Sequence, residues 1–481
     1  MSQTLFGIFY DLKTILIVVF LNRTLKDKEM KRRQILKSLA LTGVAPLLSF
    51  KSVPGGISTS DANLFNEPAK QIVLAEDTDV VVCGGGPAGV AAAIAAARSG
   101  AKTRLIEVHG CLGGIWTVGL LSNLIDHEDK SGIMREIVER LKASDAQITA
   151  KNYDSEAMKV LLDTMCQEAG VDIRLHTRVV AAFTNSKNKL ETIITESQSG
   201  REAWKAKTFV DATGNGDLAA QAGCSFDMGH PDSGKIQPAS MMAILTGLKR
   251  DEIINNNLTR HAGVKNSMHK LNLKKEIQEA GMDPSYGLPT LFPIRDDLFA
   301  LMANHQYDVN SLDAQDITNA TLQSRLEVNN IVDRLRKKGG IWSKMRIVAT
   351  SEQIGLREGR RIRGLYTVTK EDLIKGAKFK DAACRVNFPV DIHSIDGKVS
   401  KGLGNDGIKA LPYDIPVRSL ISKDVGGLLM AGRCISGDFF AHASYRVTGN
   451  AVAMGETAGN IAAIASKKGC LPQEVKWGRA K

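Results

Sequence analysis

The stretch from Asp79 to Glu107 decides the fold, and it reads DVVVCGGGPAGVAAAIAAARSGAKTRLIE. A β-branched run, Val80 to Val82, suits a strand that is buried on both faces. Three glycines follow with Gly-x-Gly-x-x-Gly spacing, and an alanine-rich segment comes directly after them. This order of strand, glycine turn and helix predicts a dinucleotide-binding unit, whereas an ordinary glycine-rich turn is the alternative.

Each glycine has a separate physical task in such a unit. Gly84 permits the tight turn, Gly86 lets the backbone approach a pyrophosphate, and Gly89 lets the helix pack close to the strand. The predicted helix begins at Pro87 and Ala88, where free N–H groups and the positive end of the helix dipole favour phosphate.

A second predicted strand, Thr103 to Ile106, ends at Glu107. A carboxylate at this distance is expected to accept hydrogen bonds from the adenosine ribose, and it disfavours a 2′-phosphate. The same glycine spacing recurs later in the chain, but there it follows a lysine-rich polar loop rather than a strand: Gly402, Gly404 and Gly407. We therefore expect a single dinucleotide site.

Composition limits the other classes of function. The chain has 481 residues and a net charge of +11, and residues 1–50 hold eight Lys and Arg against three acids. The remainder has no basic run with interleaved aromatic residues, so nucleic-acid binding is not expected. Seven scattered cysteines without a Cys-x-x-Cys pair predict no disulfide framework and no metal site.

The N-terminal segment resembles an export signal. Residues 30–50 contain Arg32-Arg33 followed by a weakly apolar stretch, as in twin-arginine signals, although an ordinary amphipathic helix is the alternative. We expect a periplasmic protein without a stable membrane span, since the apolar run Thr14 to Leu21 is shorter than the roughly 20 residues that a span needs. Our hypothesis is that Met30 is the true start, which N-terminal sequencing of the precursor tests.

The rest of the chain is expected to alternate between helices and strands. Helical periodicity covers residues 131–170, and a strand with a hairpin series follows at 178–184, 190–196 and 203–210. Asp211-Ala-Thr-Gly-Asn-Gly-Asp217 closes this unit with small residues. Near the C-terminus we expect a short apolar strand at 428–430 and a helix of small residues at 450–465.

These elements, in this order, resemble FAD-dependent oxidoreductases with a glutathione-reductase-like FAD domain. The likeness is closest to a bacterial family related to the flavin subunits of fumarate reductase and heterodisulfide reductase, and it covers roughly residues 77–466. It rests on the first glycine motif, on Glu107, on Gly113-Gly114, on 211–217, and on four later stretches: 355–364, 413–420, 427–436 and 444–459.

The resemblance implies an α/β fold. A Rossmann-like FAD-binding domain, with a parallel sheet and a β-meander, would be split into two halves around an inserted α+β substrate or cap domain. The corresponding division is as follows: an extension plus signal at 1–50, a linker at 51–76, the first half at 77–225, the cap at 226–405, the second half at 406–470, and a tail at 471–481.

It also implies a set of cofactor contacts beyond the first motif. Gly113 and Gly114 let the chain pass close to the diphosphate, and Arg446 is expected near the diphosphate or the flavin, with a structural salt bridge as its alternative. Trp116 or Thr117 could touch the flavin or be packed core, and Cys111 could anchor flavin covalently or be a structural thiol. The other expected contacts are Val179, Ala212, Thr213, Gly214, Gly432, Arg433 and Asn450.

A flavin dehydrogenase also needs a base for the proton that leaves with the hydride, and histidine suits this task. His442, which precedes the helix expected to face the flavin, is the first candidate. His393 is the second, and for each a structural role is the alternative. Tyr445 and Arg295 are weaker candidates for substrate contact.

The resulting expectation is an FAD-dependent oxidoreductase of the dehydrogenase type. It would transfer a hydride between a small polar substrate and FAD N5, and an external quinone or carrier protein would take the electrons. Alternatives are a flavin-dependent isomerase or hydratase without net redox change, a reductase running in the opposite direction, and a non-catalytic electron-transfer subunit.

Overall fold

The structure is a computed structural model that describes residues 67–261 and 267–478. The expected export signal, the hypothesis about Met30 and most of the expected linker lie outside these residues. In the part of the chain that is described, no helix has both the length and the apolar character needed to cross a membrane.

The main sheet is built on a parallel core. Its strands are β2 (Thr78–Cys83), β3 (Thr103–Ile106), β4 (Asp172–Arg174) and β7 (Gly200–Asp211), in the order β4-β3-β2-β7. A strand from the far end of the sequence, β18 (Leu428–Met430), adds to β7 in parallel, with Leu429 opposite Val210. The chain therefore returns after more than 200 residues to complete the sheet that it began.

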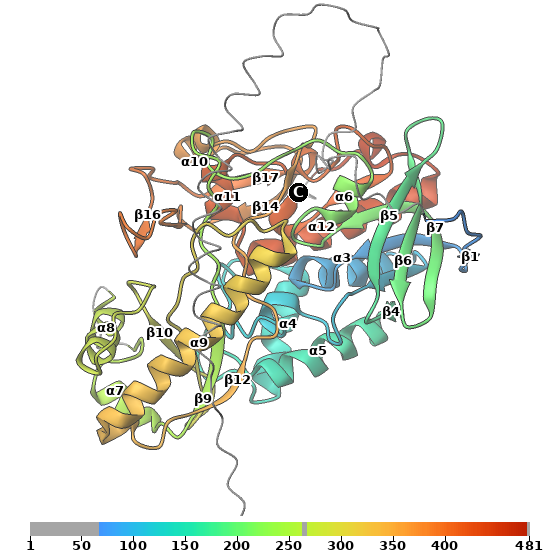
Figure 1. The fold of residues 1–481 in the computed structure, drawn as a ribbon. Coiled ribbons are helices and arrows are strands. Elements are labelled where there is room, and N and C mark those ends of the chain that lie inside the picture. The colour runs from blue at the N-terminus through green and yellow to red at the C-terminus, as the bar shows by residue number, and fades with distance from the viewer. Residues whose placement is uncertain (1–66, 262–266, 479–481) are drawn as a thin grey trace, which may run out of the picture. The chain divides into compact units, whose positions relative to one another are not determined.

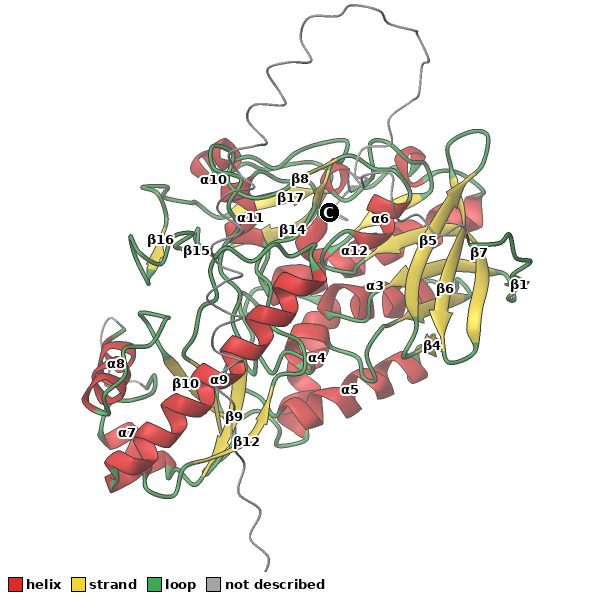
Figure 2. Cartoon of the chain, in the orientation of Figure 1, coloured by secondary structure: helices red, strands yellow, loops and turns green. Residues whose placement is uncertain are grey.

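The β-meander expected from the sequence is confirmed. β5 (Arg178–Thr184) pairs with β6 (Leu190–Ser197), and β6 pairs with β7, both antiparallel. β7 is long enough to belong to both parts: its first half forms the meander, and its second half forms the parallel core (Figure 2). The α/β fold class is thus the expected one.

Two helices from opposite ends of the chain, α3 (Pro87–Arg98) and α12 (Thr448–Lys468), lie side by side (Figure 1). A Cβ placed at Gly455 or Gly459 would lie 2.0 or 2.1 Å from the carbonyl oxygen of Ala88 or Ala92, respectively. The small residues of α12 are therefore needed for the backbone contact between the helices. α4 (Gly132–Ala143) and α5 (Ser155–Glu168) contribute side chains to the same core.

The inserted region has a sheet of its own, in the order β10-β11-β9-β12. Its strands are β9 (Met242–Thr246), β10 (Thr290–Pro293), β11 (Phe299–Met302) and β12 (Arg346–Thr350), and all neighbours are antiparallel. Three helices accompany this sheet, namely α7 (Arg250–Asn255), α8 (Met268–Glu279) and α9 (Ala314–Lys338). These elements share a separate apolar core, and we call residues 242–350 the cap.

The remaining elements lie outside the cap and the six main strands of the central sheet. They are β1 (Val73–Leu74), β8 (Phe226–Asp227), β13 (Arg361–Ile362), β14 (Ala382–Val386), β15 (Ile392–His393), β16 (Leu403–Gly404), β17 (Tyr413–Pro416), α6 (Asp217–Gln221), α10 (Lys370–Lys375) and α11 (Phe439–Tyr445). The second Gly-x-Gly-x-x-Gly stretch forms the short hairpin of β15 and β16 instead of a strand–helix turn.

Three contacts of the structure involve the expected boundaries. β1 pairs with β7, so residues 73–74 belong to the sheet rather than to a linker. β14 and β17 pair with each other across the expected division at 405. Pro472 and Trp477 pack against the body of the protein, so the described part of the tail is folded. Local sequence carries little information about such long-range pairing.

Candidate active site

The first glycine motif forms a turn with almost no room for side chains. Gly84 has a φ of +97°, and a Cβ there would lie 2.5 Å from the carbonyl oxygen of Ala212. A Cβ at Gly89 would lie 1.7 Å from the carbonyl oxygen of Gly84. At Gly86, by contrast, no atom lies within 4 Å of an added Cβ. Gly86 is thus the one glycine of the motif where the protein leaves open space.

The Gly113-Gly114 pair lies against this turn. The backbone N–H of Gly113 donates to the carbonyl of Gly85 at 2.7 Å, and a Cβ at Gly114 would be 3.0 Å from the Cα of Gly86. Both glycines have positive φ, +108° and +51°. The two glycine segments therefore border the same space beside Gly86.

Glu107 is buried at the end of β3 and holds the turn by hydrogen bonds. Its carboxylate accepts from the backbone N–H groups of Gly85 and His109. The backbone carbonyl of Glu107 also accepts from Thr177, which leads into β5 and Val179. The contact of Glu107 with a ribose stays a prediction, and a ribose would have to share the carboxylate with the turn.

Asp211 at the end of β7 fixes the small residues that follow it. Its carboxylate accepts hydrogen bonds from the backbone and hydroxyl of Thr213 and from the backbone of Ala219. Burial raises its pKa to about 6, although these three donors oppose the shift. The N–H of Ala212 donates to Cys83, so this segment runs next to the glycine turn.

Gly432 lies against the glycine turn, and Arg433 binds the segment that follows the cap in the sequence. A Cβ at Gly432 would lie 3.0 Å from that of Ala88. The Arg433 guanidinium donates to the carbonyl of Gly214 at 2.9 Å and also to the carbonyl of Leu356. Burial lowers the pKa of Arg433 to about 10.

Asn450 lies in the first turn of α12 and is fully buried. Neither atom of its side-chain amide has a hydrogen-bond partner among the described residues. A buried amide without a partner costs free energy, about 1 to 3 kcal/mol, and such groups in proteins normally have a partner. The open space beside Gly86 and this unpaired amide are both expected where a ligand is held.

A cluster of polar side chains, contributed by segments far apart in the sequence, lies next to Leu356. Arg357 donates to the carbonyl of Pro238 and to the Ser240 hydroxyl, the latter at 2.9 Å. Arg446, at the end of α11, donates to the Gln237 side chain and to the backbone carbonyl of Asp391, at 3.1 and 2.8 Å. We call Gln237, Arg357, Asp391, His393 and Arg446 the polar cluster.

Asp391 and His393 form an acid–histidine pair inside this cluster. His393 Nε2 lies 3.4 Å from Asp391 Oδ2, and its Nδ1 lies 3.0 Å from His305 Nε2. Burial lowers the pKa of His393 to about 3, helped by Arg357, so the ring is neutral at physiological pH. Burial alone would raise the pKa of Asp391, but His393 and the arginines lower it below its usual range.

Some residues in the cluster, and His305 beside it, were not identified from the sequence. Gln237, His305, Arg357 and Asp391 come from different loops, and no motif or spacing relates them. Asp391 was visible only as the residue two positions before His393. Arg357 lies inside the Gly355–Gly364 stretch that carried part of the family resemblance.

His442 lies in α11, one helical turn before Arg446, and its ring is fully buried. Its nitrogens have no well-formed hydrogen bond within the described chain, and burial together with Arg361 keeps its pKa well below the usual value. The ring packs edge-on to Tyr445, whose hydroxyl donates to Ile435. Arg295 is 63% exposed in its side chain and pairs with Asp154, apart from the cluster.

The residues on either side of the Gly-Gly pair contact other parts of the protein, and their contact with flavin stays a prediction. Trp116 is fully buried and meets Tyr153 edge-to-face with ring centroids 6.4 Å apart. The Thr117 hydroxyl donates to the backbone of Leu112. Cys111 is half-buried, and burial raises the pKa of its thiol, which does not favour a reactive thiolate.

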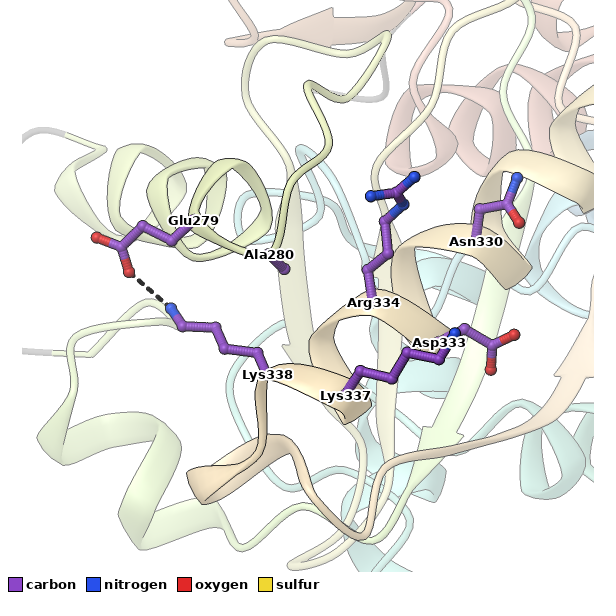
Figure 3. A pocket seen from close by; sticks show the side chains of 7 residues that line it. All are labelled: Glu279, Ala280, Asn330, Asp333, Arg334, Lys337 and Lys338. Carbon is purple, nitrogen blue, oxygen red and sulfur yellow. Dashed lines mark hydrogen bonds and ion pairs between the residues drawn. The ribbon is translucent and has the colours of Figure 1, made fainter.

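A surface pocket also occurs at the C-terminal ends of α8 and α9, with a volume of about 520 Å³ (Figure 3). Its lining is charged and includes Lys337 and Lys338 next to Asp333. Lys338 pairs with Glu279 at 2.6 Å. None of the residues expected to bind cofactor or substrate lines this pocket.

Comparison with known proteins identifies the family of the chain. The model of a family described as FAD dependent oxidoreductase matches residues 79–481. Thiamine thiazole synthases from Methanococcus vannielii and Methanococcus maripaludis are 30% and 29% identical over 149 residues, which is 29% of this chain. The chain covers 57% of the first enzyme and 56% of the second, so it spans little more than half the length of these curated relatives.

Solved structures with a similar fold are distant in sequence. A flavin-dependent brominase, Bmp2, is 13% identical with a TM-score of 0.43, over 84% of this chain and 81% of that one. A geranylgeranyl bacteriochlorophyll reductase-like protein from Thermoplasma acidophilum is 13% identical with a TM-score of 0.41, over 82% and 78% of the two chains.

Proposed function

This chain belongs to the FAD dependent oxidoreductase family, and we propose that it is a dehydrogenase that oxidises a small polar substrate at the polar cluster. FAD is its cofactor, and when bound it supplies an N5 atom that takes up a hydride. The substrate would lose that hydride and one proton, and an external quinone or carrier protein would later accept the two electrons. Kinship with fumarate reductase and heterodisulfide reductase flavin subunits is part of the proposal.

The residues present fit FAD at the glycine turn. Gly86 leaves open space next to the backbone of Gly114, where a diphosphate could approach both segments. The N-terminus of α3 supplies unpaired N–H groups there. Asn450 has an amide in need of a partner at the start of α12, where the helix dipole favours negative charge. The expected contacts at Val179, Ala212–Gly214, Gly432 and Arg433 belong to this proposal.

One observation carries the dehydrogenase proposal: the Asp391 carboxylate and the His393 ring form an acid–histidine pair, 3.4 Å apart, in the polar cluster next to the segment that contacts Arg433. Asp391 is 24% exposed in its side chain, whereas His393 is almost fully buried. The proton would therefore enter at the Asp391 carboxylate, and His393 would orient and share it. Arg357 and Arg446 lower the pKa of both groups in the free protein, and they would do so less once a bound substrate offset their positive charge. We propose this role for His393 in preference to His442, which has no such partner.

The experiment is a substrate screen by bleaching of the bound flavin in the absence of oxygen. Bleaching by one compound, with electrons recovered by an added quinone or dye, supports the dehydrogenase. Product formed without bleaching and without an acceptor would contradict it and favour the isomerase or hydratase.

We also propose that the protein is exported to the periplasm through the twin-arginine route. The support is the Arg32-Arg33 stretch, together with the ability of that route to carry a folded protein with its cofactor inserted. Replacing both arginines by lysine should retain the protein in the cytoplasmic fraction. Unchanged distribution between periplasm and cytoplasm would contradict this proposal.

A further inference from the structure

The polar cluster carries more positive than negative charge. Arg357 and Arg446 are cations, and the Asp391 carboxylate is 3.8 Å from Arg446. Two cationic side chains thus face one carboxylate in the cluster.

The other acid nearby is already neutralised. Glu358 is buried and pairs with Arg361 at 3.1 Å, and its second oxygen accepts from the backbone of Gln237 at 2.7 Å. It therefore leaves the excess of cations in the cluster unchanged. Burial, and then Arg446, lower the pKa of Arg357 to about 10, which is the effect expected of a cation whose charge is not compensated.

Two hydrogen-bond donors of the cluster also lack an acceptor in the described chain. The Gln237 side-chain oxygen accepts twice, from the backbone of His393 and from Arg446, but its Nε2 donates to no described group. Arg446 Nε is likewise a buried donor without an acceptor in the described chain. Both unpaired groups are donors, so the missing partner is a hydrogen-bond acceptor.

We propose that the substrate of this dehydrogenase is an organic acid, and that Arg357, with Arg446 and Gln237 around it, binds its anionic group. An anion supplies both things that the cluster lacks, which are negative charge and acceptor oxygens. A planar guanidinium can bind a carboxylate through two parallel hydrogen bonds, whereas a lysine acts as a point charge. The inference rests on the proposed function and narrows its substrate class.

The binding geometry also explains the use of the Asp391–His393 pair. An anionic group held by Arg357 fixes the substrate by electrostatic attraction, and the nearby Asp391 carboxylate then receives the proton from the carbon or hydroxyl being oxidised. The negative charge of Asp391 disfavours a second carboxylate at the same spot.

The test uses the FAD-loaded protein and simple probes, at constant ionic strength. Acetate and inorganic phosphate are titrated while the visible flavin spectrum and the unfolding temperature are followed, with glycerol as a neutral control. We expect saturable binding of at least one anion and none of glycerol. Arg357→Gln should weaken the anion at least tenfold without loss of FAD.

A matched control is Lys337→Gln, which removes one positive charge from the surface pocket on α9 and should leave anion binding unchanged. Absence of saturable anion binding to the wild-type protein would overturn the proposal. The proposal would also be overturned if the Arg357→Gln protein lost FAD while the fraction that kept FAD still bound anions normally. Arg357 would then bind the cofactor diphosphate rather than the substrate. Anion binding is measured without catalytic turnover. Failure of the bleaching screen, which tests the proposed function, is therefore distinguishable from failure of the anion-binding proposal.

Discussion

The glycine turn and the polar cluster differ in how they are built. The turn spans residues 84–89 and works through close backbone contacts within one strand–helix unit and its neighbours α12 and Gly113-Gly114. The polar cluster works through side chains that reach one place from loops at 237, 357, 391 and 446. A cofactor site can therefore be read from local spacing, whereas a substrate site depends on the tertiary fold.

The largest expected effect comes from breaking the backbone contact that supports the turn. Gly459→Val in α12 places a β-branched side chain where even a Cβ lies 2.1 Å from the carbonyl oxygen of Ala92. We expect a loss of at least about 4 kcal/mol of unfolding free energy, or no soluble protein. Urea unfolding followed by circular dichroism measures it.

The control for this variant is Gly426→Ala, where the nearest atoms lie at an ordinary contact distance of 3.5 Å. It should change stability by less than about 1 kcal/mol. Equal stability of Gly459→Val and the wild type would mean that α3 and α12 do not pack as described.

The next largest effect should occur in the polar cluster. Asp391→Asn keeps the shape of the side chain but removes the carboxylate that receives the proton. We expect the rate of flavin bleaching by the identified substrate to fall about 10²- to 10⁴-fold, with FAD content unchanged. Stopped-flow absorbance measures this rate.

Asp396→Asn is the matched control, because Asp396 is an exposed acid five residues later that pairs with Lys235. Its bleaching rate should equal that of the wild type. If both variants bleach at the wild-type rate, the acid–histidine pair has no part in proton removal.

A smaller effect is expected from a substitution at Gly86, which should weaken FAD binding without changing the stability of the protein. Gly86→Ala adds a methyl group where the protein has no atom within 4 Å, so the FAD-free protein should unfold as before. The same methyl group would collide with a diphosphate, and we expect FAD affinity to fall roughly 10- to 100-fold, or about 1.4 to 2.8 kcal/mol. Fluorescence titration of the FAD-free protein measures the affinity.

Gly402→Ala in the second glycine stretch provides the comparison, since its nearest atom is the Ser400 hydroxyl at 3.5 Å. It should bind FAD as the wild type does. A loss of affinity at Gly402 but not at Gly86 would move the cofactor to the β15–β16 hairpin.

The smallest expected effect concerns the histidines of the cap. His269 on α8 is buried, and burial lowers its pKa to about 4 from an ordinary value of 6.5. Between these values the unfolded chain binds a proton that the folded protein does not, so stability falls as pH falls. His269→Leu should remove this loss, which we put at up to about 2 kcal/mol between pH 6.5 and pH 4.5.

Urea unfolding of both proteins at pH 7, 6, 5 and 4.5 measures the difference. Identical pH dependence of the two proteins would show that His269 titrates normally and is accessible to water. Because other buried groups, such as Asp211, shift in the opposite direction, only the difference between the two proteins is diagnostic.

The sequence predicted the main sheet and the glycine turn well, because strand, turn and helix are contiguous and their glycines have a spacing set by backbone geometry. The predicted bounds of β18 match the structure. The helix α12 begins slightly before and ends slightly after its predicted bounds of 450 and 465. The pairing of β14 with β17 across the expected division at 405 was not predicted, because some 30 residues without a recognisable signal separate the two strands.

The polar cluster was largely beyond prediction. His393 was a candidate, but it stood alone in the sequence, and His305 and Arg357 approach it only in the folded protein. His442 ranked higher because it precedes α12, and sequence position could not reveal that its ring is fully buried. Convergent side chains lack a period or spacing, so their discovery requires the fold.

The most direct test of the central claim is the visible spectrum of purified residues 51–481, before and after acid precipitation. We predict flavin absorbance bands in the folded protein, and the acid supernatant should contain FAD in nearly equimolar amount. Colour retained in the pellet would instead indicate a covalent link and draw attention back to Cys111. A colourless folded protein that does not regain the bands with added FAD would contradict the assignment of the glycine turn to FAD.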